Sequence, residues 1–405
     1  MTAPAPRSAA VIGGGIVGLS VALALQARGL GVAVYDAPEA RAPASAGNAG
    51  HIAVEQHAPL ASLANLRTLP GRLMRLGGPV SFPPAAIGHW LPFGLRLLRA
   101  AAPARFARGR QALGALLAEA LPAWRRLLDA VGAPDLLRPQ GNIVAWESPA
   151  GARRGRAALR EDASPLAQWR DLTAAEAELL DGVVRLRPVD AVCIAGSASV
   201  ADPGAVLEAL RAALRAGGGT LDRRACTVAQ ARRSGADVIV VAAGVRSAPL
   251  LRELGHRAPL IAERGYHIQS ARSRWPPSLP SVVFAERAVV ATRFLSGLRA
   301  TSILEFTHPD APPDPRAWAR LAAHAAALGL PFDGPLETWV GSRPTLPDYL
   351  PAIGRSAADP RVLYAFGHQH LGLTLGPVTG EIVAALACRE APAPDLAPFS
   401  VARFG

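Results

Sequence analysis

The sequence contains no lysine, so all 43 of its basic residues are arginine. Abundant alanine beside an arginine-only basic set indicates a GC-rich coding background. This bias raises the formal charge to +12 without producing a basic surface suited to a nucleic-acid backbone. No basic block with interleaved aromatic residues occurs, so the composition argues against a nucleic-acid partner.

Cysteine is also scarce. The three cysteines, Cys193, Cys226 and Cys388, lie far apart, and none belongs to a CxxC pair or a Cys/His cluster. This spacing excludes a disulfide framework and predicts no metal site. The segment from Met1 to the first expected strand is short and rich in Pro and Ala, with no signal region or membrane-spanning run, so we expect a cytoplasmic protein.

At 405 residues, half of them hydrophobic, the chain is long enough for two domains with a sizeable core. Its clearest motif is VIGGGIVG at residues 11–18, between a short apolar run and a helical pattern at 19–29. In such a motif Gly13 permits the tight turn and Gly15 lets the backbone approach a pyrophosphate. Gly18 lets the helix pack on the strand.

The free N–H groups at the start of the helix that follows this turn favour bound phosphate, and Ile16 and Val17 of the motif are expected to contact the cofactor. A second strand at residues 31–35 ends in Asp36, where an acid accepts hydrogen bonds from both ribose hydroxyls of adenosine. An acid there repels a 2′-phosphate and disfavours NADP. The motif therefore predicts a dinucleotide, with FAD and NAD both open.

Two later segments extend this prediction. Residues 237–245 form a buried-strand pattern that ends in small residues, Ala243 and Gly244, beneath the expected nucleotide. Residues 363–380 are glycine-rich and open into an expected helix, Glu381 to Cys388. The dipole of that helix would stabilise the charge of a reduced flavin, which favours FAD. The residues expected there against the cofactor are Gly367, Leu371, Gly372, Leu373 and Thr374.

Together these segments resemble the FAD-dependent amino-acid oxidoreductases, the group with D-amino-acid oxidase and dehydrogenase, glycine oxidase and sarcosine oxidase. The resemblance spans most of the chain and also rests on ASAGNAGH at 44–51 and GSRPTLPD at 341–348. Residues 47–52 and RGYH at 264–267 look most similar to the D-amino-acid dehydrogenase branch, which includes enzymes acting on hydroxylated D-proline.

The resemblance implies an α/β fold with a doubly wound, Rossmann-like FAD-binding domain. It also implies a substrate domain built on a large, mostly antiparallel sheet. We assign residues 1–88, 191–254 and 338–405 to the FAD domain, and residues 89–190 and 255–337 to the substrate domain. A capped helix is predicted at 205–216, after Asp202 and before Gly217.

The resemblance also implies the residues of the site. Arg343 is expected to hold the substrate carboxylate, because a guanidinium makes a bidentate, permanently charged fork. Tyr266 and His267 fall on a strand facing the flavin, where alternation allows only one of them to reach the substrate, and we favour Tyr266. His51 and His368 are further candidates for substrate contact. The expected flavin-binding residues are Ser45, Gly47, Asn48, Ala49, Gly50 and Gly341.

The implied activity is oxidation of a small D-amino acid, with hydride passing from Cα to the flavin. In the sarcosine oxidase branch a cysteine near the matching Arg-Pro segment carries the flavin covalently. Residues 341–354 contain no cysteine, so the resemblance implies non-covalent FAD. The sarcosine oxidase branch places a lysine near the flavin to promote reaction with oxygen, and its absence here favours a dehydrogenase with a quinone or protein acceptor. The alternatives are a glycine- or sarcosine-type oxidase, a tRNA-modifying flavoprotein, and a subunit of an electron-transfer complex.

Residues 90–99, followed by Arg105, Phe106 and Arg108, have the pattern of an amphipathic helix with basic residues. One interpretation is a helix that lies on anionic lipid near a quinone pool, at the inner membrane. The other is a helix packed on the substrate domain, with its arginines in water.

Overall fold

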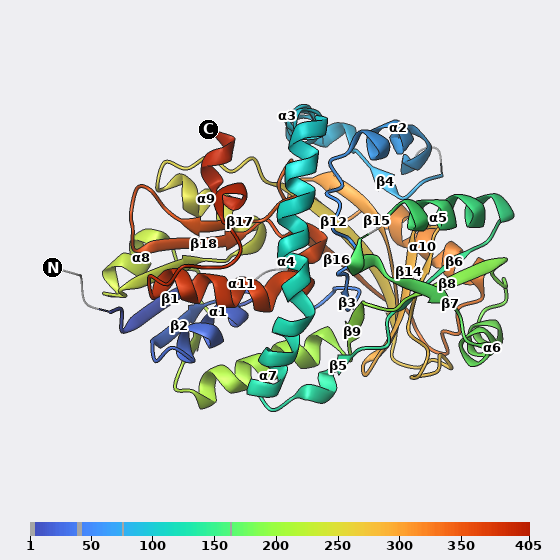
Figure 1. Cartoon of the computed structure of the whole chain (residues 1–405), viewed down its shortest axis with the longest axis horizontal. Helices are drawn as coiled ribbons and strands as arrows, with labels where there is room; N and C mark the ends of the chain where they lie inside the picture. Colours follow the sequence, from blue (N-terminus) through green and yellow to red (C-terminus); the bar gives the residue numbers. More distant parts are fainter. Residues whose placement is uncertain (1–4, 39–42, 75–76, 163) are drawn as a thin grey trace.

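The computed structural model describes residues 5–38, 43–74, 77–162 and 164–405 (Figure 1). Two sheets stand side by side in this structure, with helix α4 (Pro103–Ala130) running along the boundary between them. The first four residues of the Pro/Ala-rich N-terminal segment lie outside the described residues.

The first sheet is the predicted nucleotide-binding sheet. Its five neighbouring strands β10 to β18 are parallel, and β17 pairs antiparallel with β18 at the edge. In spatial order the strands are β10 (Thr220–Asp222), β2 (Gly31–Tyr35), β1 (Ser8–Ile12), β11 (Val238–Val241), β18 (Val362–Phe366) and β17 (Ala352–Arg355).

Helix α1 (Ile16–Gln26) follows β1 after the glycine turn and packs between α7 (Pro203–Ala216) and α11 (Gly372–Ala387). The predicted capping of α7 is confirmed. The carboxylate of Asp202 accepts hydrogen bonds from the backbone N–H groups of Gly204 and Ala205, and Gly217 ends the helix. Helices α8 (Val228–Arg233) and α9 (Ser247–Arg252) flank β11 in sequence.

The second sheet has nine strands and is mostly antiparallel, as expected. Among the described strands of this sheet, only the pairs β6–β13 and β4–β15 are parallel. The order is β16, β12, β15, β14, β13, β6, β8, β7, with β4 beside β15. The strands are β4 (Val80–Ser81), β6 (Asn142–Trp146), β7 (Trp169–Asp171), β8 (Asp190–Ile194), β12 (Ile261–Ser270), β13 (Ser281–Phe284), β14 (Val289–Phe294), β15 (Gly297–Thr307) and β16 (Glu337–Thr345).

A small three-stranded sheet lies between the two large ones, in the order β3, β9, β5 (Figure 1). Its strands are β3 (His51–Ile52), β9 (Ala198–Val200) and β5 (Leu137–Arg138). The remaining helices are α2 (Leu63–Arg72), α3 (Ile87–Ala100), α5 (Pro149–Glu161), α6 (Ala174–Val183) and α10 (Pro315–Leu328). Helix α10 packs on β12 and β15.

Helix α11 begins at Gly372, nine residues before the predicted start at Glu381, so that expectation was wrong. Its glycines serve close helix packing and do not form a long turn. A Cβ added at Gly380 would lie 2.6 Å from the carbonyl oxygen of Ser20 on α1. The segment Gln369–Ala387 is long and apolar enough to cross a membrane, but 78% of its most apolar window is buried against the protein.

The secondary structure crosses the expected domain boundaries at several places. Strands β4, β8 and β16 belong to the nine-stranded sheet, although most of their residues fall in the segments assigned to the FAD domain. Helix α4 falls in a segment assigned to the substrate domain, yet it packs on α11 and shares its hydrophobic core with α1. The precise domain division stays a prediction.

Candidate active site

A continuous cavity of about 1210 Å³ runs between the two sheets. One end is lined by the glycine turn after β1, and the other by β12, β15 and β16 of the nine-stranded sheet. The residues predicted to bind the cofactor that line it are Gly13, Gly15, Ile16, Val17, Asp36, Ser45, Gly47, Asn48, Ala49, Ala243, Gly244, Gly341, Gly372 and Leu373. The cavity therefore joins segments that are more than 300 residues apart in sequence.

The glycine turn leaves no space for side chains. Gly13 has a φ of +114°, and a Cβ there would lie 2.3 Å from the carbonyl oxygen of Ala242. A Cβ at Gly18 would lie 1.9 Å from the carbonyl oxygen of Gly13. Gly18 does not line the cavity and allows the turn to close on α1, as predicted for a packing glycine. The backbone of this turn can therefore approach a pyrophosphate closely.

Asp36 lies at the carboxyl end of β2 and is fixed from two sides. Its Oδ1 accepts a hydrogen bond from the backbone N–H of Gly14, with 3.0 Å between the heavy atoms. Its Oδ2 pairs with the guanidinium of Arg223, whose side chain is 55% exposed. Because more than half of the Arg223 side chain is exposed, it can turn into solvent and leave the carboxylate to accept hydrogen bonds from ribose hydroxyls.

The loop at residues 44–50 is fixed by the nine-stranded sheet. The buried guanidinium of Arg299 donates hydrogen bonds to the carbonyl oxygens of Ala46 and Asn48. Burial lowers the pKa of Arg299 to about 10, so it stays cationic at neutral pH. The hydroxyl of Thr292 donates to the carbonyl of Ala49. With its carbonyls held from the sheet side, this loop presents a rigid wall to the cavity.

His267 supports the same loop and does not line the cavity. Its Nδ1 donates a hydrogen bond of 3.1 Å to the carbonyl of Gly47, and its ring stacks on Trp339 with 4.8 Å between ring centroids. Burial and the charge of Arg299 lower the pKa of His267 to about 3, so the ring is neutral. His267 therefore holds the 44–50 loop in place, while Trp339 forms part of the cavity wall.

Three other predicted cofactor residues, Gly50, Gly367 and Leu371, lie behind the cavity wall. Gly50 and Gly367 have positive φ values, of +76° and +79°, which glycine adopts without strain. Thr374 also lies behind the wall, where its hydroxyl accepts a hydrogen bond from the backbone N–H of Ala53. The expectation of direct cofactor contact does not fit these positions.

The N-terminus of α11 does reach the cavity, through Gly372 and Leu373. His368, just before it, lines the cavity but is otherwise enclosed, and its Nε2 lies 3.0 Å from the hydroxyl of Thr379. Burial lowers the pKa of His368 to about 3. The hydrogen bond to Thr379 therefore gives His368 a structural role. The positive end of the α11 dipole faces the cavity.

Arg343 lines the opposite end of the cavity, on β16. Its Nη1 lies 3.3 Å from Oε1 of Glu263, the residue paired with it across the β12–β16 ladder. The other carboxylate oxygen of Glu263 accepts hydrogen bonds from the hydroxyls of Thr345 and Tyr349. Among the described residues, Nε and Nη2 of Arg343 have no hydrogen-bond partner, so they can receive a carboxylate.

A second guanidinium, that of Arg72 at the end of α2, lines the same cavity. Burial raises the pKa of Tyr349 well above its usual value, and the nearby charges of Arg343 and Arg72 oppose that rise. Both cations therefore act on one region. This part of the cavity therefore offers an anionic group the positive charges of Arg343 and Arg72. The carboxylate of Glu263 is buried and already paired with Arg343.

Two histidines and two acceptors line the adjoining wall. Nε2 of His51 lies 3.4 Å from Oε1 of Glu55, and Nε2 of His370 donates to Oε1 of Gln56 at 2.6 Å. Nε2 of His51 and Oε2 of Glu55 are buried and have no hydrogen-bond partner among the described residues. Burial, followed by the charges of Arg343 and His51, lowers the pKa of His370 to about 3.

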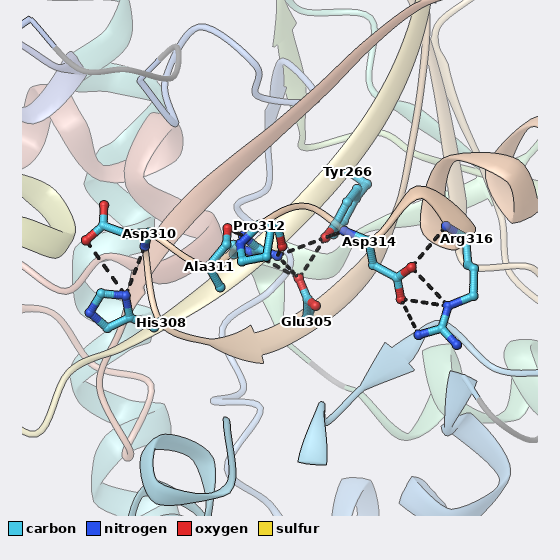
Figure 2. Close-up of polar contacts among 9 residues, drawn as sticks. Tyr266, Glu305, His308, Asp310, Ala311, Pro312, Asp314 and Arg316 are labelled. Atoms are coloured by element: carbon cyan, nitrogen blue, oxygen red, sulfur yellow. Dashed lines mark hydrogen bonds and ion pairs between the residues drawn. The ribbon is translucent and has the colours of Figure 1, made fainter. Parts of the chain in front are cut away.

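Tyr266 does not line the cavity, so the expected substrate contact was wrong. Figure 2 shows it with Glu305 and Asp314 instead. Its hydroxyl donates to Glu305 at 2.7 Å and accepts from the backbone N–H of Asp314 at 3.0 Å. The ring packs edge-on against Trp318 of α10. Glu263, Gly265 and His267 alternate onto the face of β12 that contacts Arg343 and the 44–50 loop, so Tyr266 points to the opposite face.

The structure adds Glu263, Arg72, Glu55, Gln56 and His370 to the residues predicted from sequence. A signal for Glu263 was present, because an acid two residues before Gly265 lies on the same face of the strand. His370 follows His368 by two residues in the same turn. Nothing in the sequence indicated Arg72, whose position depends on the path of α2.

The parallel sheet, its glycine turn, the terminal acid and a second sheet closing the same cavity define a dinucleotide-dependent oxidoreductase. A family model described as FAD dependent oxidoreductase matches residues 8–386, and the chain belongs to this family. The resemblance found in the sequence is thereby confirmed, and the cofactor is FAD. The glycine cradle at Gly13 and the fixed 44–50 loop fit this cofactor.

Full-length relatives agree with this family. The chain is 31% identical to a D-amino-acid oxidase of Bradyrhizobium diazoefficiens, over 99% of this chain and 100% of the relative. It is 30% identical to D-amino acid dehydrogenase 2 of Pseudomonas aeruginosa, over 95% and 96%. Among solved structures, iminodiacetate oxidase from Chelativorans sp. BNC1 superposes with a TM-score of 0.71 at 22% identity, covering 97% of this chain and 98% of that one. This last likeness concerns the fold alone.

Proposed function

We propose that the protein oxidises small D-amino acids at Cα, giving imino acids, and passes the electrons to a quinone or protein acceptor. D-Proline and its hydroxylated derivatives are the specific substrates we favour. The observation that carries the proposal is Arg343, whose guanidinium faces the cavity with two nitrogens free of protein hydrogen bonds. The named relatives, a D-amino-acid oxidase and a D-amino acid dehydrogenase, support the substrate class.

In this proposal Arg343 binds the substrate carboxylate, and Arg72 adds positive charge at the same end. The ion pair with Glu263 holds the guanidinium of Arg343 in place. We assign the amino group of the substrate to the His51–Glu55 pair, where Nε2 of His51 is free to take its proton. The bound FAD supplies the two-electron acceptor.

Loss of that proton gives the amine the lone pair that assists hydride departure from Cα. The 44–50 loop, held by Arg299, and Trp339 form the wall beside the site, and this wall would help to position the bound substrate. A dehydrogenase rather than an oxidase is favoured by the lack of any lysine in the chain. A cytoplasmic location with contact to the inner membrane fits a quinone acceptor.

Anaerobic addition of amino acids to the purified flavoprotein tests the proposal. We expect D-amino acids, D-proline among them, to bleach the flavin absorbance, and their L-enantiomers, glycine and sarcosine to bleach it much more slowly. R343A is the matched control, because it should keep the flavin spectrum and fail to bleach at the same substrate concentration. No bleaching by any D-amino acid contradicts the substrate class.

The acceptor is tested on the reduced protein. We expect a soluble quinone to restore the flavin absorbance faster than dissolved oxygen does. Faster recovery with oxygen assigns the protein to the oxidases and contradicts this part of the proposal.

A further inference from the structure

Helix α3 presents a stripe of large apolar side chains to solvent. The exposed fractions are 51% for Ile87, 46% for Leu91, 55% for Leu95 and 53% for Leu98. Spacings of four, four and three residues place all of them on one face of the helix. A fifth exposed apolar side chain, that of Leu63, lies on α2, and Figure 1 shows α2 and α3 along the same edge of the molecule.

The other face of α3 holds the helix on the protein. Trp90, Phe93 and Leu97 pack in a small core with Val80 and Phe306. The indole nitrogen of Trp90 also donates to the carbonyl of Pro83. The helix is therefore anchored by one side, and its exposed stripe has no covering element among the described residues. Single exposed leucines need no explanation, but a continuous stripe of four indicates a contact surface.

The charge around this stripe has one sign. Residues 56–118 contain eight arginines and no aspartate or glutamate, although the whole chain carries 31 acidic residues. Arg96 and Arg99 lie on α3 itself, and Arg105, Arg108 and Arg110 follow in the first turns of α4. An apolar stripe bordered only by cations is the pattern of a helix that lies in the interface of an anionic bilayer.

We propose that this face of α3 docks on an anionic lipid surface. Its leucines enter the boundary between headgroups and acyl chains, and its arginines bind lipid phosphates. A second copy of the chain is a poorer occupant, because a two-fold contact would bring α3 against α3 and set arginine against arginine. Anionic lipid neutralises the same charges.

The helix that carries the docking face contacts a segment that lines the active-site cavity. The ring of His89 at the start of α3 lies 5.2 Å from that of His308, centroid to centroid, and the next two residues, Pro309 and Asp310, line the cavity. Arg72 of α2 lines it as well. Docking therefore brings lipid beside the cavity wall. Access of a membrane quinone from there rests on the proposed function, whereas lipid binding does not.

Vesicle sedimentation with the FAD-loaded full-length protein tests the proposal. We expect binding to vesicles of phosphatidylcholine mixed with phosphatidylglycerol, weak binding to phosphatidylcholine alone, and release by salt. L91Q/L95Q should weaken binding at least about tenfold, because two apolar side chains no longer enter the interface. R96Q/R99Q should weaken it about fivefold for each arginine removed.

The matched controls replace the same residue types elsewhere. L295Q/L336Q changes two other exposed leucines, and R215Q/R233Q changes exposed arginines on α7 and α8. Both should bind as the wild type does. Thermal unfolding and flavin absorbance of each variant confirm that it is folded and loaded.

Equal wild-type binding to both kinds of vesicle, or unchanged binding by L91Q/L95Q, overturns the proposal. A dimer in solution that L91Q/L95Q converts to a monomer, with no vesicle binding by either protein, makes the stripe an interface between copies and also overturns it. Bleaching of the flavin by D-amino acids is measured without vesicles. Failure of the docking face is thereby distinguished from failure of the proposed function.

Discussion

The guanidinium of Arg343 occupies the space that a side chain at Gly265 would fill. A Cβ placed on Gly265 would lie 2.3 Å from Nη2 of Arg343. Gly265 is two residues from Glu263 on the same face of β12, and Glu263 pairs with Arg343. The glycine and the acid therefore fix the guanidinium from neighbouring positions on one strand.

Gly265→Ala should move the guanidinium of Arg343, because the contacted atoms are at the free end of a long side chain. The substrate carboxylate then meets a displaced partner. We expect KM to rise about tenfold, roughly 1.4 kcal/mol. The free energy of unfolding should change by no more than about 1 kcal/mol, since a flexible side chain and not backbone must yield. Steady-state kinetics and urea unfolding measure the two effects.

Gly114→Ala is the control for this substitution. Gly114 lies within α4, and an added Cβ there has no other atom within 4 Å. Its kinetics should equal those of the wild type. An unchanged KM in G265A would mean that the position of Arg343 does not matter to substrate binding.

Arg343→Ala removes the proposed carboxylate partner. The loss of a charge-assisted bidentate pair should cost about 2 to 5 kcal/mol of binding, seen as a much higher KM. FAD content should stay constant, because Arg343 lies at the end of the cavity away from the glycine turn. R343K keeps the positive charge but cannot form the bidentate pair, so its KM should lie between those of the wild type and R343A. Wild-type kinetics in R343A would refute the assignment.

Glu263→Ala should reduce stability. Its carboxylate is buried and is bound by Arg343, Thr345 and Tyr349, so its removal leaves a cation and two hydroxyls without their acceptor. We expect the free energy of unfolding to fall by about 3 kcal/mol in urea titrations. E337A, at an exposed position of β16, should change it by less than about 0.5 kcal/mol. Equal effects of both substitutions would contradict the role given to Glu263.

The nucleotide-binding half of the site was accessible from sequence because its signals are local. Close contacts around one strand–turn–helix unit favour glycine at positions 13, 15 and 18, and Asp36 follows the next strand. The capping of α7 by Asp202 is equally local. Such features depend on neighbours in the chain and not on how the sheets are placed.

The substrate half depends on long-range placement. Alternation showed that Tyr266 and His267 point to opposite faces, but only the packing of α10 on β12 shows which face is covered. Arg72 reaches the cavity through the path of α2, which no local pattern determines. The glycines of α11 were taken for a turn because sequence does not distinguish a glycine that bends the chain from one that admits a neighbouring helix.

Buried neutral histidines should make stability depend on pH. His368 has its pKa lowered by burial from 6.5 to about 3. Between these two values the unfolded chain binds a proton at this residue and the folded chain does not. The free energy of unfolding therefore falls as pH is lowered from about 6.5 toward 3, by up to about 1.4 kcal/mol for each pH unit. His267, whose pKa is also lowered to about 3, adds a fall of the same sign.

His368→Gln removes one of these groups while offering Thr379 another hydrogen-bond partner. The loss of unfolding free energy between pH 6 and pH 5 should be smaller than in the wild type by about 1 kcal/mol. Urea unfolding at the two pH values measures it, with H308Q as the control because the side chain of His308 is 48% exposed. If H368Q loses as much stability as the wild type over this interval, His368 is protonated in the folded protein, and its bond to Thr379 does not depend on a neutral ring.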